Sequence, residues 1–83
     1  MTESASDPHL VQLLERTEDL ESFLRFVSAL ERDVVTHRGE WQNWTIDGYL
    51  EAAVAWARDS RQLPEPASWR SFAEFLYAGK IYE

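Results

Sequence analysis

Apolar residues recur at three- and four-residue steps through most of the chain, the spacing that places side chains on one face of an α-helix. The longest run, within residues 20–37, carries Leu20, Phe23, Leu24, Val27, Leu30 and Val34. Shorter runs follow Asp7-Pro8, fill residues 46–60 and occupy residues 68–79. No alternation typical of a β-strand lasts beyond about four residues. The pattern predicts an all-α fold, a small bundle of three principal helices plus a short N-terminal helix.

The first two helices are expected to be separate. The apolar stripe of residues 20–34 is rotated by roughly 100° from that of residues 10–14, so one unbroken helix could not turn both toward one core. A break is therefore expected near Thr17, whose side chain is suited to cap the second helix. Asp7 is expected to cap the first helix, with Pro8 at the first helical position.

Further signals mark the ends of the later helices. His37 suits the carboxyl end of the second helix, and Gly39 suits the left-handed residue that commonly follows a helix. Thr45 is the expected cap of the third helix. The last helix is expected to start at Pro66 or Ser68 because Pro66 cannot continue a preceding helix.

The length of 83 residues fits one domain. Residues 1–7 are expected to form a flexible acidic N-terminus and residues 8–83 a single helical domain. Eleven aromatic residues, four of them tryptophan, supply large apolar surfaces for a small core. The core expected from the three principal helices consists of Phe23, Val27, Leu30, Leu50, Ala53, Trp56, Phe72 and Leu76.

The formal net charge of −7 is concentrated in residues 1–21. An acidic chain repels phosphate backbones, so no nucleic-acid partner is expected, and a protein with a basic surface is the favoured partner. The sequence has no cysteine, which suits a reducing compartment. It has neither a signal-peptide pattern nor a long apolar run, so we expect a cytoplasmic protein with no membrane partner.

Residues suited to catalysis are few. His9 and His37 are the only histidines, and no phosphate-binding glycine loop or metalloprotease motif is present. We therefore predict no cofactor, no metal and no catalytic residue. The alternative is an enzyme or small-ligand site that uses Glu31, His37 or Glu40 in a pocket beside the tryptophans. In the structural interpretation, Glu31 instead reaches solvent or an arginine.

The segment GEWQNWT, residues 39–45, places two tryptophans in a short connection between helices. In the structural interpretation, Trp41 and Trp44 close an open end of the bundle, and Asn43 either ties the connection to helix ends or caps the helix that begins near Thr45. In the functional interpretation, one indole stays exposed as the anchor of a protein interface, with Glu40 on its rim.

The segments FLRFVSALERD, EWQNWTIDGYLEA and SWRSFAEFLYAGKIYE span about residues 20–83 in this order. With the Trp-x-Asn segment at Trp41 and Asn43 and the Tyr-Glu ending at Tyr82, the chain resembles a family of small bacterial domains of unknown function. The resemblance implies a bacterial cytoplasmic origin and carries no reaction or cofactor.

The leading hypothesis is a non-enzymatic protein-interaction module, in one version an immunity-like or antitoxin-like inhibitor of a basic partner. The alternative is the small-ligand or enzyme site beside Trp41 and Trp44. A homodimer formed through an apolar helix face is a third hypothesis. The predicted protein-binding residues are Glu40, Trp41, Asn43, Trp44 and Tyr82.

Overall fold

The computed structural model describes residues 6–82. The described residues form α1 (Ser6–Glu15), α2 (Leu20–Thr36), the 3₁₀ turn η1 (Arg38–Glu40), α3 (Ile46–Ser60) and α4 (Trp69–Ile81), with no strand among them. The predicted all-α fold is confirmed. Residues 1–5, residue 83 and the side chains of residues 6–8 lie outside the described structure, as do the predictions made for them, the flexible acidic N-terminus and the cap at Asp7.

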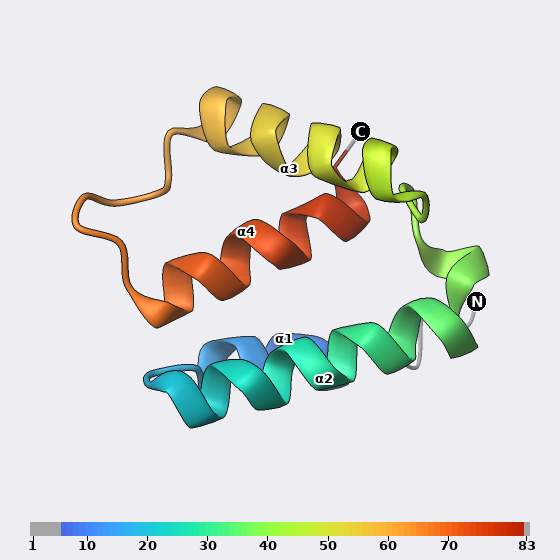
Figure 1. Ribbon diagram of the computed structural model, residues 1–83, viewed down its shortest axis with the longest axis horizontal. Helices are drawn as coiled ribbons and strands as arrows, with labels where there is room; N and C mark the ends of the chain where they lie inside the picture. Colours follow the sequence, from blue (N-terminus) through green and yellow to red (C-terminus); the bar gives the residue numbers. More distant parts are fainter. Residues whose placement is uncertain (1–5, 83) are drawn as a thin grey trace.

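The helices form two antiparallel hairpins, α1 with α2 and α3 with α4 (Figure 1). The last helix, α4, packs against each of the other three helices. Within the described chain, α2 and α3 do not pack against each other. They flank α4 on either side, so one face of α4 has no helix over it (Figure 1).

The start of α2 differs from the expectation at Thr17. The N-cap is Asp19, whose carboxylate accepts from the Ser22 backbone N–H at 2.9 Å in a reciprocal capping box. Hydrogen bonds from Ser22 lower the pKa of Asp19. Thr17 is buried and donates its hydroxyl to the Leu13 carbonyl at 2.9 Å, so it closes α1 and does not open α2.

The other helix ends follow the sequence with two exceptions. Thr45 caps α3, as predicted, and Ser68, one of the two predicted starts of the last helix, caps α4. Gly39 does not adopt the left-handed conformation, because the chain continues from α2 directly into η1. That conformation occurs at Arg61, which ends α3 with φ of 57°. Helix α4 ends at Ile81, beyond the apolar run of residues 68–79 that predicted it.

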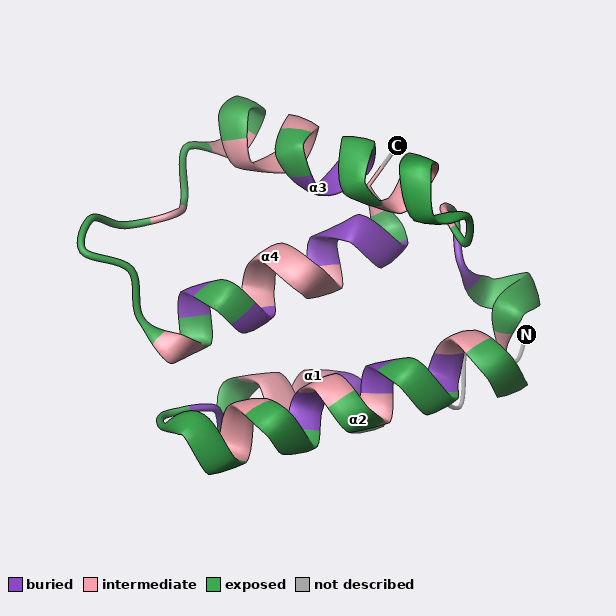
Figure 2. Ribbon diagram, in the orientation of Figure 1, coloured by how far each residue is buried: buried purple, intermediate pink, exposed green. Residues whose placement is uncertain are grey.

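The core lies where α4 meets the first hairpin and the aromatic connection (Figure 2). Its buried cluster contains Leu10, Phe26, Leu30, Trp41 and Ala73. Two residues predicted to be internal, Leu50 and Phe72, are 48% and 46% exposed. They are exposed because α2 and α3 do not close over α4. Phe26, which was not among the predicted core residues, is fully buried in the same cluster as Leu10 of α1.

A buried ion pair joins the two hairpins. The Lys80 ammonium of α4 lies 3.0 Å from Oδ2 of Asp33 on α2, and both side chains are almost completely buried. The same carboxylate oxygen accepts the Trp41 indole N–H at 2.7 Å, and Oδ1 lies 3.2 Å from Nδ1 of His37. The Lys80 ammonium also lies 5.8 Å from the centre of the Trp41 ring. These contacts fasten α2, α4 and the connection at one point.

Two further contacts hold the connection on the carboxyl end of α4. The Asn43 side-chain amide donates to the Tyr82 carbonyl at 2.6 Å and to the Gly79 carbonyl at 3.3 Å. The Gln42 backbone N–H donates to the Lys80 carbonyl at 3.0 Å. The predicted role of Asn43 as the residue that ties the connection to a helix end is confirmed. These bonds satisfy carbonyls that the end of α4 would otherwise leave unpaired.

Helices α3 and α4 approach closely at Gly79. A Cβ added there would lie 2.6 Å from the ring of Tyr49. This ring cannot swing away freely, because its hydroxyl donates to the Leu76 carbonyl at 2.7 Å and its centre lies 5.8 Å from that of the tilted Trp41 ring. Burial raises the pKa of Tyr49 to about 12, so the phenol stays a donor at neutral pH. Small residues are buried on both helices, among them Ala52, Ala53, Ala73 and Ala78.

We expect Gly79→Ala to lower the free energy of unfolding by about 2 kcal/mol, because the new methyl group overpacks against Tyr49. Gly39→Ala is the matched control, since no atom lies within 4 Å of its Cβ position and its φ is not positive. We expect the control to stay within about 0.5 kcal/mol of wild type. Urea unfolding followed by circular dichroism measures both, and equal stability of the two variants would contradict the close approach.

We expect Lys80→Met to lower the free energy of unfolding by about 3 kcal/mol, because it leaves the Asp33 carboxylate buried without its cation. Asp33→Asn combined with Lys80→Met removes both charges and retains an acceptor for the Trp41 indole. The double variant should regain at least half of the loss in urea unfolding. If the losses of the single variants simply add in the double variant, the two groups do not interact in the way described.

Candidate functional site

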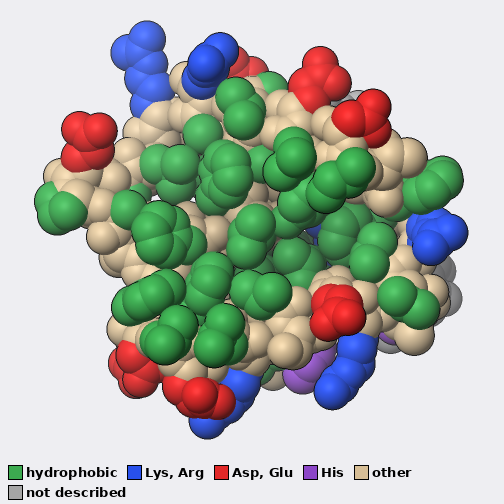
Figure 3. Space-filling view, in the orientation of Figure 1, with side chains coloured by type: hydrophobic (Ala, Val, Ile, Leu, Met, Phe, Trp, Pro, Cys, Tyr) green, Lys and Arg blue, Asp and Glu red, His purple; other side chains and the backbone are tan. Residues whose placement is uncertain are grey.

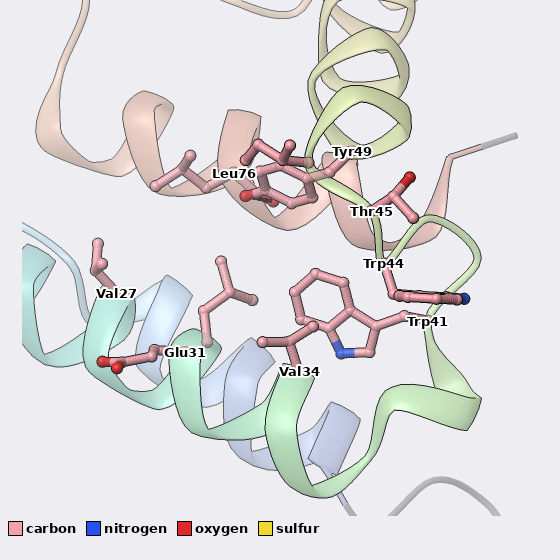
Figure 4. A pocket seen from close by; sticks show the side chains of 10 residues that line it. Val27, Glu31, Val34, Trp41, Trp44, Thr45, Tyr49 and Leu76 are labelled. Atoms are coloured by element: carbon pink, nitrogen blue, oxygen red, sulfur yellow. Dashed lines mark hydrogen bonds between the residues drawn. The ribbon is translucent and has the colours of Figure 1, made fainter.

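An open groove of about 290 Å³ lies between α2 and the start of α3. Val27, Glu31 and Val34 project from α2 on one side, and Trp44, Thr45 and Tyr49 lie on the other (Figure 4). Leu76 of α4 contributes to the floor. Leu30, Trp41 and Ile46 complete the lining. The groove exists because α2 and α3 flank α4 without meeting, and its surface is almost entirely apolar.

The apolar surface continues beyond the groove. On α3, Ile46 is followed by Leu50 and Val54 at four-residue steps, and all three side chains are exposed. On α4, Phe72 precedes Leu76 by one turn, and on α2, Leu24 precedes Val27. Figure 3 shows hydrophobic side chains gathered across this face, with charged side chains mostly around it. We call these residues together with the groove lining the apolar face.

Aromatic packing continues the apolar face toward the start of α4. The Phe23 ring centre lies 5.3 Å from that of Trp69 and 6.2 Å from that of Phe72. Trp69 and Phe72 meet edge to face with ring centres 5.8 Å apart. This cluster packs α2 against α4 while leaving Phe72 half exposed. Leu50 and Phe72, predicted as core, are therefore surface residues of this face.

Glu31 is the only charged residue in the groove lining. Its side chain is exposed, as the structural interpretation of the sequence predicted. Within residues 6–82 it has neither an ion-pair nor a hydrogen-bond partner for its carboxylate. The groove therefore presents a broad hydrophobic surface and one carboxylate at its wall.

The two tryptophans of the connection differ in exposure. Trp41 is 8% exposed and its indole N–H is bonded to Asp33, so it belongs to the core. Trp44 is 52% exposed and borders the groove, with the Arg38 guanidinium 5.1 Å from its ring centre. Trp41 covers the bundle end as the structural interpretation expected, whereas Trp44 largely faces solvent. The contacts of Asn43 and Gln42 with α4 hold Trp44 in this position.

The five predicted binding residues do not share one surface. Trp41 and Trp44 line the groove, whereas Asn43 binds the end of α4. Glu40 is exposed on η1 outside the groove lining. The Tyr82 hydroxyl donates to Asp59 at 2.6 Å, which raises the pKa of Tyr82.

Sequence reasoning missed the buried pair of Asp33 and Lys80, although a signal was present. Asp33 follows Phe26 and Leu30 at helical spacing, and Lys80 follows Ala73 and Leu76 in the same way. A charged residue at helical spacing from buried apolar residues lies on the same helix face as they do. When two helices that pack together each carry such a residue, and the two charges are opposite, a buried ion pair is indicated.

The groove lining does not bring together the acid and base residues considered from the sequence. The imidazole of His37 lies near Asp33 and Thr36 and does not line the groove, so it forms no pair with Glu31 there. Across the described residues, no cluster of three or more histidine, aspartate and glutamate side chains is placed to hold a metal ion. In the same part of the chain, no helix is both long and apolar enough to span a bilayer.

The model of a family of unknown function, DUF7660, matches residues 19–83. The match extends from the cap of α2 to the end of the chain and includes every residue of the groove lining, while α1 lies outside it. The resemblance drawn from the three sequence segments is confirmed at the level of a family of unknown function. No curated protein and no solved structure matches the chain.

Proposed function

We propose that this chain, which belongs to the DUF7660 family, is a non-enzymatic protein-interaction module. In this role it binds a basic partner through the apolar face. The observation that carries this proposal is the open groove between α2 and α3, lined by nine uncharged residues and Glu31. Soluble monomeric proteins rarely leave a large contiguous apolar surface exposed, and such surfaces mark interaction sites. Trp44 and Tyr49 are of the residue types that dominate binding energy at interfaces.

The charge of the chain supports a basic partner. A net charge of −7 accelerates encounter with a cationic surface and disfavours acidic partners. An immunity-like or antitoxin-like inhibitor of a basic protein is the form of this function that we favour. We place it in the bacterial cytoplasm, a reducing compartment that suits a chain without cysteine.

A small-ligand site in the same groove is the second candidate. Its support is that Glu31 lies in one wall while Trp41 and Trp44 form part of the rest. A ligand with an apolar body and one positive charge would match this chemistry. The absence of a histidine from the lining favours binding without turnover.

We expect Ile46→Gln to reduce partner binding about tenfold, because it places an amide in the apolar groove. Ile46 is 72% exposed, so the substitution leaves the fold intact. Val35→Gln is the matched control, since Val35 is 69% exposed and lies outside the groove lining. Wild type, Ile46→Gln and Val35→Gln are each immobilised and used to capture proteins from a lysate of the organism that encodes the chain. The captured partner is then purified and titrated against each of the three proteins.

A basic protein retained by wild type and Val35→Gln, but lost from Ile46→Gln and weakened by about 0.5 M salt, is the expected result. Equal titration curves for Ile46→Gln and Val35→Gln would contradict binding through the groove. Tight binding of an acidic protein would contradict the basic partner.

A further inference from the structure

We infer that the segment bound in the groove is an amphipathic α-helix that carries an arginine or lysine opposite Glu31. This inference rests on the proposed function and names the element that the partner supplies. It follows from three features of the described residues. The groove walls offer no strand edge to a bound peptide, apolar residues continue along the helices beside the groove, and the lining carries one charge, that of Glu31.

The walls of the groove favour a helix over an extended peptide. An extended segment binds stably when its backbone pairs with the edge of a sheet. The described chain has no strand, and the groove lining consists of side chains projecting from helices and from the Trp41–Thr45 connection. An extended backbone laid there would lose water without gaining partners, whereas a helix satisfies its own N–H and C=O groups.

Each helix beside the groove carries exposed apolar residues beyond the groove lining. Each groove-lining residue has an exposed apolar residue one turn away: Val27 has Leu24 on α2, Ile46 has Leu50 on α3, and Leu76 has Phe72 on α4. Figure 3 shows that this face extends beyond the groove itself. A helix placed between α2 and α3 would cover all three stripes with residues at i, i+3, i+4 and i+7. It would fill the place over α4 that none of the four helices occupies.

The carboxylate of Glu31 selects a basic helix. An apolar helix seated in the groove would remove water from Glu31, and an unpaired carboxylate taken out of water costs several kcal/mol. Glu31 has no partner within residues 6–82 that could replace this water. A cationic side chain on the bound helix removes the cost and adds a charge-assisted hydrogen bond. A second copy of this chain is disfavoured, because it brings another net charge of −7.

Selection from a phage-displayed library of random peptides about 18 residues long tests the inference without a chosen sequence. The full-length protein serves as bait in four forms: wild type, Glu31→Lys, Ile46→Gln and Val35→Gln. Peptides enriched on wild type are synthesised and titrated against each form by fluorescence anisotropy. Circular dichroism of the mixture reports whether the peptide gains helix when it binds.

The expected peptides bind wild type and Val35→Gln equally and bind Ile46→Gln about tenfold more weakly. They carry apolar residues at i, i+3, i+4 and i+7, contain arginine or lysine, and gain helical signal when bound. Glu31→Lys should also weaken them about tenfold, since it replaces attraction by repulsion. Groove-dependent peptides that stay extended, lack a basic residue or ignore Glu31→Lys would overturn the inference and leave the proposed function standing.

Two further outcomes test whether the groove is a binding site at all and whether its occupant is a second copy of this chain. If no peptide distinguishes Ile46→Gln from Val35→Gln, both the inference and the proposed groove fail. Sedimentation equilibrium of wild type over a dilution series tests the second copy. One chain per particle at every concentration supports the inference, whereas a dimer that Ile46→Gln abolishes would overturn it and identify the occupant as another copy of this chain.

Discussion

The carboxylate of Asp33 is the point on which the arrangement of this small protein depends. It lies within hydrogen-bonding distance of the Lys80 ammonium, the Trp41 indole and the His37 imidazole, and thereby connects α4, the aromatic connection and the end of α2. A chain of 83 residues buries a smaller fraction of its surface than a larger domain does, so each buried polar contact weighs more in its stability. A buried pair gives little net stability, but it is directional, and one misplaced partner leaves a charge unsatisfied. We infer that this requirement sets the register of the two hairpins.

The exposed groove is a consequence of how that contact is placed. The pair joins α2 to the last turn of α4, while Gly79 lets α3 approach the same turn through Tyr49. Both neighbours of α4 are thus fixed near its carboxyl end, on different sides of it. Nothing brings α2 and α3 together over its remaining face, so the stripes of apolar residues that point toward one another across α4 stay open to solvent. The same geometry that secures the core leaves an apolar groove exposed to solvent.

Much of the fold could be predicted from the sequence because helical periodicity and helix caps are local signals. The caps at Thr45 and Ser68 and the tie made by Asn43 follow from residue type and position. Thr17, Leu50 and Phe72 were misplaced for different reasons. Thr17 donates backward to the helix before it, whereas Leu50 and Phe72 are exposed beside the groove because α2 and α3 do not meet over α4. Periodicity states which face is apolar, not whether another helix covers it. The helical spacing of Asp33 and Lys80 relative to apolar residues marks each of them as a candidate for burial, but their pairing depends on tertiary packing, because they lie far apart in the chain.

Hydrogen exchange of the two indole N–H groups, followed by NMR of the free protein, tests this account most directly. The indole proton of Trp41 is bonded to Asp33 and buried, so it should exchange only as the protein unfolds. The indole proton of Trp44, in a side chain 52% exposed, should exchange nearly as fast as in an unstructured peptide. Strong protection of Trp44 would mean that the groove is closed in the free protein. Rapid exchange of Trp41 would mean that the contact with Asp33 does not hold the connection in place.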